Sequence, residues 1–252
     1  MSNKRFIPLL IPLIGLILNE TVLLYPKLFF VSLTLGSLII FLGIKLLGRN
    51  NKEKFWPFFS ILPILLFLSF STYAALISSG LLVQLFFLAA FVLNFYYLRT
   101  LYYYLINKEY DRGIQLSSFS VFAGFFIIFC IYSSVFFLPL FINLQPSLLA
   151  LIPFPIIWFL FFNGVYFNLK SFTEGALIFF INALVLAQLA WILSYFPLSA
   201  NILGFIVALI YYLFVIISLL HFKGNLNRKT AKWPIILVLF SFLILFLTAH
   251  WL

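Results

Sequence analysis

Residues 28–47 read LFFVSLTLGSLIIFLGIKLL, and the next seven residues, 48–54, read GRNNKEK. An α-helix of about 20 apolar residues is about 30 Å long, which matches the hydrocarbon core of a bilayer. Short loops rich in Lys and Arg remain in the cytoplasm when such helices are inserted. The same combination of apolar stretch and short polar loop recurs along the chain, so it decides the fold class.

The composition agrees with a chain that is dissolved in lipid. Of its 252 residues, 65% are hydrophobic and 8% are charged, whereas soluble domains carry about 25% charged residues. So few charges cannot cover the surface of a water-exposed globule of this size. We therefore predict an all-α integral membrane protein, a single transmembrane helical domain over residues 1–252, without a soluble domain.

The apolar stretches predict a polytopic bundle of about nine transmembrane helices. The first stretch lacks a small-x-small cleavage site, so we expect it to remain as an uncleaved span. Pro153 and Pro155 lie near the start of the sixth span. The predicted spans are residues 6–24, 28–47, 56–78, 81–106, 114–141, 148–169, 172–195, 200–221 and 233–252.

Nine spans place 14 of the 15 basic residues on one side of the membrane, and only Lys27 on the other. By the positive-inside rule, the N-terminus is cytoplasmic and the C-terminus extracytoplasmic, in a cytoplasmic (inner) membrane. The net charge of +10 then indicates contact with anionic headgroups at the cytoplasmic face rather than with nucleic acid. The basic residues of the cytoplasmic side are Lys4, Arg5, Lys45, Arg49, Lys52, Lys54, Arg99, Lys108, Arg112, Lys170, Lys223, Arg228, Lys229 and Lys232.

No motif in the sequence indicates a catalytic or cofactor site. Cys130 is the only cysteine, and His221 and His250 belong to opposite ends of their spans, so neither a thiolate cluster nor a bis-histidine haem pair is expected. The sequence also lacks a P-loop and a zinc motif. We therefore expect no cofactor, no metal site and no catalytic residue, and the sequence does not favour an enzyme.

Polar residues at membrane depth are the remaining candidates for function, because an unpaired polar group in hydrocarbon is costly. We predict a candidate polar cavity formed by Asn94, Arg99, Asn163, Tyr166, Glu174 and Asn182. Each has a structural alternative: the amides pack helices together, Arg99 extends to the interface, and Glu174 favours its own helix N-terminus beside Lys170. The tyrosines of residues 96–104 surround their helix instead of following one face.

Small residues predict where helices approach one another closely. They mark faces of the second, fifth and eighth spans: Ser32, Gly36 and Gly43; Ser120 and Gly124; and Gly204 and Ala208.

Three classes of function agree with this sequence. The amides and the Pro-interrupted spans favour a carrier or channel for a small or lipid-like molecule. The scarcity of titratable groups equally favours a non-catalytic subunit or scaffold with a membrane protein partner. A lipid-modifying enzyme is the third class, and Arg99 and Glu174 would have to carry its chemistry.

Overall fold

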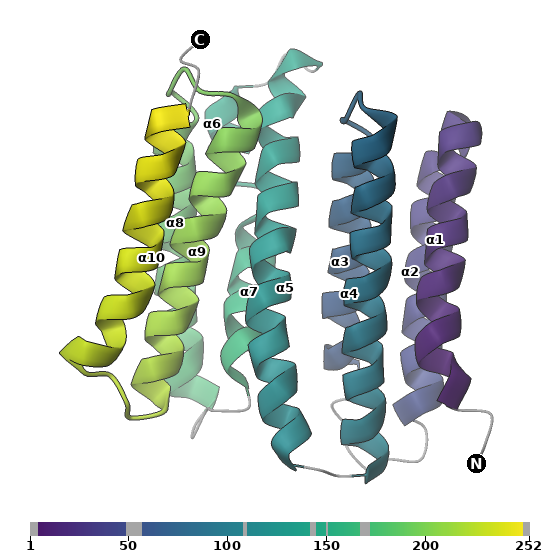
Figure 1. Ribbon diagram of the computed structural model, residues 1–252, viewed down its shortest axis with the longest axis horizontal. Coiled ribbons are helices and arrows are strands. Elements are labelled where there is room, and N and C mark those ends of the chain that lie inside the picture. Colours follow the sequence, from purple (N-terminus) through teal and green to yellow (C-terminus); the bar gives the residue numbers. More distant parts are fainter. Residues whose placement is uncertain are drawn as a thin grey trace. The chain divides into compact units, whose positions relative to one another are not determined.

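A computed structural model of the chain consists of helices joined by short turns (Figure 1). It describes residues 5–48, 57–107, 110–141, 145–149, 151–166 and 172–248, and these residues contain no strand. The helices are α1 (Ile7–Leu24), η2 (Pro26–Leu28), α2 (Phe29–Gly48), α3 (Phe58–Ala74), α4 (Gly80–Asn107), α5 (Tyr110–Phe137), η3 (Leu138–Leu140), α6 (Pro146–Leu149), α7 (Phe154–Val165), α8 (Phe172–Leu193), α9 (Ala200–Phe222) and α10 (Arg228–Thr248).

Six described helices are long and apolar enough to cross a membrane: Ile7–Leu24, Pro26–Gly48, Gly80–Leu105, Gly113–Phe137, Gly175–Leu193 and Ala200–Phe222. The apolar helices α3 and α7 are shorter, with 17 and 12 residues. At 1.5 Å per residue they are about 25 Å and about 18 Å long, less than a hydrocarbon core of about 30 Å. The described residues are all-helical, and the six long apolar helices indicate a multi-pass membrane protein.

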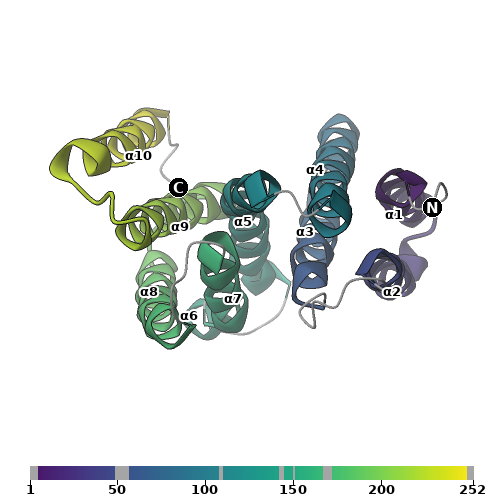
Figure 2. The ribbon, with the colours of Figure 1, turned by 90° about the horizontal axis from the view of Figure 1, so that it is seen from below.

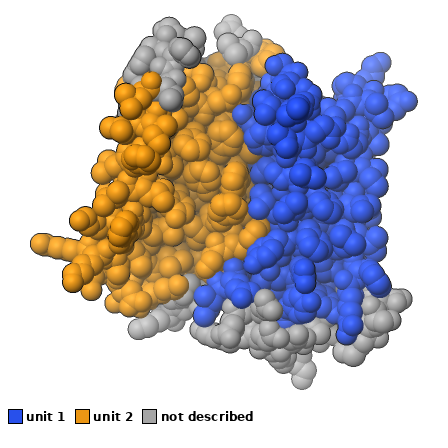
Figure 3. Space-filling view, in the orientation of Figure 1, with its two compact units in different colours: residues 1–116 blue, residues 117–252 orange. Residues whose placement is uncertain are grey.

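The chain divides into two compact units, residues 1–116 and residues 117–252 (Figure 3). We call them unit 1 and unit 2, and the boundary between them falls inside α5. The prediction of a single domain over residues 1–252 stays a prediction.

Unit 1 contains α1 to α4, in which α1 and α3 each pack against both α2 and α4 (Figure 2). Phe67 of α3 lies at the centre and is 3% exposed. A Cβ on Gly15 would lie 3.5 Å from its ring, and a Cβ on Gly36 would overlap it. A Cβ on Gly43 would likewise overlap the side chain of Ile11. The predicted close packing of the second span is thus confirmed at Gly36 and Gly43.

A proline inside α3 is matched by a hydrogen bond from α4. Pro63 has no backbone N–H, so the carbonyl of Phe59, four residues earlier, lacks its usual helical donor. The hydroxyl of Tyr97 donates to this carbonyl oxygen at 3.1 Å. Tyr97 is fully buried, so its hydroxyl and the freed carbonyl satisfy each other away from water.

Unit 2 contains the rest of α5 and the helices α6 to α10. In it, α7 and α8 pack against each other and against α9, and α10 packs along α9 (Figure 2). A Cβ on Gly204 of α9 would lie 2.7 Å from the backbone nitrogen of Ser133 in α5. Gly124 of α5 likewise gives room to Tyr211 of α9. Glycine therefore lets α5 and α9 approach, as predicted for the fifth and eighth spans.

The sixth predicted span, residues 148–169, is not one continuous helix in the described residues. A turn at residues 151–153 separates α6 from α7. Pro153 explains the break, because it lacks an N–H and disfavours helix at the residue before it. Pro155 lies in the first turn of α7, where its missing N–H costs nothing. The other end of α7 is stabilised by α5, where the hydroxyl of Ser117 donates to the carbonyl oxygen of Gly164 at 2.6 Å.

Candidate functional site

The six predicted cavity residues are divided between the two units. Asn94 and Arg99 belong to α4 in unit 1, whereas Asn163, Tyr166, Glu174 and Asn182 belong to α7, its C-terminal cap and α8 in unit 2. A cavity that combines all six therefore stays a prediction, and each unit is considered by itself.

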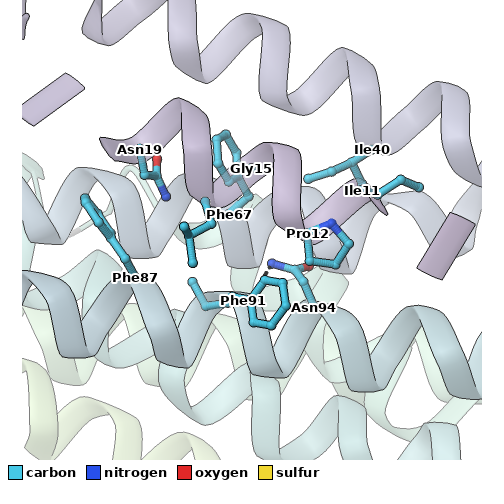
Figure 4. Close-up of a pocket in the computed structure, with 11 residues that line it drawn as sticks. Ile11, Pro12, Gly15, Asn19, Ile40, Phe67, Phe87, Phe91 and Asn94 are labelled. Atoms are coloured by element: carbon cyan, nitrogen blue, oxygen red, sulfur yellow. Dashed lines mark hydrogen bonds between the residues drawn. The ribbon is translucent and has the colours of Figure 1, made fainter. Parts of the chain in front are cut away.

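Asn94 faces the interior of unit 1 and is 5% exposed. Its Nδ2 donates to the carbonyl oxygen of Ala90 at 3.1 Å, while its Oδ1 has no hydrogen-bond partner. Beside it, between α1 and α4, is a cavity of about 10 Å³ that Asn19 and Pro12 also line (Figure 4). We call this the amide cavity. It has room for about one water molecule, so this part of unit 1 is closely packed.

Asn19 is a buried amide that the sequence did not single out. Its Oδ1 lies 2.8 Å from the hydroxyl of Ser71, which lies equally close, at 2.7 Å, to the carbonyl oxygen of Phe67. A serine hydroxyl has one proton, so the two acceptors share it. This contact links α1 to α3 and supports the interpretation of buried amides as packing contacts.

Arg99 lies on a different face of α4 and is exposed. Five residues separate it from Asn94, which turns the two side chains well apart around a helix of 3.6 residues per turn. The Cζ atom of Arg99 lies 6.0 Å from the centroid of the Phe95 ring, one turn earlier, within the range of a cation–π contact. Arg99 and Asn94 therefore face different sides of α4.

Arg99 lines a larger cavity of about 510 Å³ between the start of α1 and the C-terminal part of α4. We call it the arginine groove. Cavities of this size hold small organic ligands. The residues that line it are Arg5, Phe6, Pro8, Leu9, Phe95, Arg99, Tyr102 and Tyr103.

The charge of the arginine groove is positive. Its described lining residues include two arginines and no acidic residue, and neither arginine forms an ion pair with a described residue. In unit 1, Glu20 lies toward the other end of α1, where its Oε2 accepts a hydrogen bond from Gln84 Nε2 at 3.1 Å. Fourteen residues of chain separate Glu20 from Phe6, about 20 Å along a helix, so this carboxylate is remote from the groove.

In unit 2, Asn182 bridges two helices. Its Nδ2 donates to the hydroxyl of Ser218 in α9 at 3.0 Å, which is the packing role expected for an amide in a membrane bundle. Asn163 is 3% exposed, and its Nδ2 has no hydrogen-bond partner. Tyr166 caps α7, where its ring contacts that of Phe162 at 5.6 Å between centroids.

Glu174 lies in the first turn of α8, but its side chain is outside the described part of the structure. The predicted partner, Lys170, is outside the described residues altogether. Among the described side chains, no three His, Cys, Asp or Glu groups come together as metal ligands would.

Sequence reasoning missed several residues of the arginine groove, although their spacing is informative. Phe95, Arg99, Tyr102 and Tyr103 follow a pattern of i, i+4, i+7 and i+8, so they share one face of α4. Because the tyrosines of residues 96–104 as a set surround the helix, the sequence alone did not single out this face. Arg5 joins it through tertiary structure, since 94 residues of chain separate Arg5 from Arg99.

Two buried hydroxyls were also missed, those of Ser133 and Tyr211, and neither has a hydrogen-bond partner. They lie where α5 meets α9, against Gly204 and Gly124.

In comparisons with known proteins, no family model, no curated protein and no solved structure matches this chain.

Proposed function

We propose that the chain is a carrier for a lipid-like molecule in a cytoplasmic membrane. It crosses the bilayer nine times, with its N-terminus in the cytoplasm and its C-terminus outside. Unit 1 supports this topology: Arg5 precedes α1, Lys45 lies in the last turn of α2, and Lys27 lies between these two helices at their other ends. The positive-inside rule places the end with Arg5 and Lys45 in the cytoplasm.

The observation that carries the proposal is the contrast between the two cavities of unit 1. The amide cavity, at about 10 Å³, is too small for a solute larger than water. The arginine groove, at about 510 Å³, lies on the outside of the helices, where Leu9 and Arg99 are exposed. A ligand that enters from the side of α1 and α4 comes from the membrane, which favours an amphiphile over a small polar solute.

A lipid-transfer measurement tests the proposal. The full chain is reconstituted into vesicles that contain a trace of phospholipid with a fluorescent headgroup, and dithionite is added to quench the outer leaflet. A carrier moves labelled lipid outward, so vesicles with protein lose more fluorescence than protein-free vesicles. Retention of a trapped soluble dye controls for leakage. If folded protein leaves the protected fraction unchanged, the proposal is wrong.

The same purified protein distinguishes the scaffold alternative from the carrier. A scaffold with a membrane protein partner predicts no lipid transfer, together with a second protein that co-purifies at fixed stoichiometry in mild detergent. The enzyme alternative requires Arg99 and Glu174 to act together; they belong to different units, and the side chain of Glu174 lies outside the described part of the structure. We favour the carrier because of the contrast between the amide cavity and the arginine groove.

A further inference from the structure

We infer that the arginine groove binds the phosphate group of a phospholipid, held between the guanidinium groups of Arg5 and Arg99. The inference rests on the proposed function for the lipid nature of the ligand. The phosphate chemistry follows from the lining of the groove itself.

The two arginines supply the charge and the geometry for this ligand. A guanidinium is always protonated and presents N–H donors in a planar fork that fits two oxygens of a phosphate. Both arginines line one cavity, and no carboxylate is among the lining residues that the structure describes. Two positive charges in one groove repel each other unless an anion lies between them, and an anionic phosphate supplies that charge.

The start of α1 strengthens the preference for an anion. Its cap residue, Phe6, makes no side-chain capping hydrogen bond, and the first turn contains no acidic residue. The N–H groups of a helix N-terminus carry a partial positive charge that attracts phosphate. Pro8 contributes no N–H, so this is a supporting contribution beside the two arginines.

The remaining lining residues fit the apolar part of a lipid. Phe6, Pro8, Leu9 and Phe95 form apolar walls. On α4, the face that carries Phe95 continues away from the arginines to Val92 and Leu88, at spacings of three and seven residues. Val92 is 50% exposed and Leu88 is 56% exposed.

On α1, an exposed apolar face likewise continues from Leu9 to Leu13 and Ile17, at spacings of four and eight residues. Leu13 is 41% exposed and Ile17 is 51% exposed. Figure 1 shows α1 and α4 side by side on the near face of unit 1, with α2 and α3 behind them. Acyl chains can therefore lie along these two helices while the phosphate remains at the arginines.

Native mass spectrometry of the full chain in neutral detergent, titrated with phosphatidic acid, tests this inference. We expect R5Q and R99Q each to weaken binding about tenfold to a hundredfold, because each loses a charge-assisted hydrogen-bonding group. R99K keeps the charge without the fork, so its loss is smaller. R228Q removes an exposed arginine at the start of α10, outside the groove, and serves as the matched control.

Two results would overturn the inference: unchanged affinity in the R5Q/R99Q double variant with native helical content by circular dichroism, or an equal loss in R228Q. Glycerol 3-phosphate and oleic acid distinguish the ligand. If glycerol 3-phosphate displaces phosphatidic acid at equal concentration, the groove binds phosphate, but a lipid as its source is refuted. If oleic acid binds as tightly as phosphatidic acid, recognition of the phosphate is refuted. Binding of phosphatidic acid without lipid transfer in the dithionite assay refutes the carrier function and leaves the phosphate site standing. Lipid transfer that persists in the R5Q/R99Q double variant refutes the phosphate site and leaves the carrier function standing.

Discussion

The close contact between α5 and α9 predicts that the substitution Gly204→Ala destabilises unit 2. The added Cβ would overlap the hydroxyl of Ser133 and would lie 2.7 Å from its backbone nitrogen and 3.0 Å from its Cα. The hydroxyl can rotate away, but the nitrogen and the Cα belong to the backbone, so no side-chain rotation relieves their overlap. Ordinary contact begins at 3.4 Å, so α5 and α9 must separate by 3.4 − 2.7, or about 0.7 Å, at this point.

Two opposing contributions set the magnitude. Alanine is favoured over glycine in a helix interior by about 1 kcal/mol. Overpacking at a close contact costs about 1–3 kcal/mol, and backbone neighbours place this site at the upper end. We expect a net loss of about 2 kcal/mol in the free energy of unfolding. For a chain of this length, that corresponds to a fall in Tm of roughly 4–8 °C.

Cys130 provides the assay, because it is the only cysteine and is fully buried in α5. A thiol-reactive fluorophore that labels it only on unfolding reports Tm for unit 2 in detergent. Gly164→Ala is the matched control in the same unit. Its Cβ would meet side-chain methyl groups of Val121 and Val215 at 3.2 and 3.3 Å, which can shift, so its net change stays within about 1 kcal/mol. A Tm for Gly204→Ala equal to or above that of the native chain would refute the close approach of α5 and α9.

Two further substitutions test hydrogen bonds between helices, each by circular dichroism during thermal unfolding in detergent. Ser117→Ala removes the donor to the Gly164 carbonyl and should cost about 0.6 kcal/mol, and up to about 1.7; unchanged stability would show that α7 does not need this bond. Tyr97→Phe leaves the Phe59 carbonyl without its donor and should cost about 1–3 kcal/mol. In a Pro63→Ala background the helix supplies its own N–H, so the loss should nearly vanish, and an equal loss in both backgrounds would contradict the pairing.

The fold class followed from the sequence, because apolar length and the absence of charge are local properties of the chain. All-helical structure is confirmed for the described residues, and six apolar helices are long enough to cross a membrane. The close packing predicted at Gly36, Gly43, Gly124 and Gly204 is confirmed as well. The count of nine spans and the orientation of the termini stay predictions.

The candidate site was harder to predict, because hydropathy does not tell which face of an apolar helix meets another helix. Asn94 and Arg99 were grouped by depth, yet one faces the interior of unit 1 and the other its surface. Asn182 was assigned both to a cavity and to packing, and its hydrogen bond to Ser218 supports packing. The sequence predicts one span over residues 148–169, whereas a turn that includes Pro153 separates α6 from α7.

By itself, the sequence determined that the chain is a helical membrane protein and that its basic residues belong to a few loops and helix ends. Those properties depend on each segment's own transfer free energy between water and lipid. Only the tertiary structure placed Arg5 and Arg99 in the lining of one groove and buried Asn94 beside a cavity of about 10 Å³. Lipid solvates every apolar face almost equally, so helix pairing is decided by shape, close packing and hydrogen bonds that form only after the helices meet.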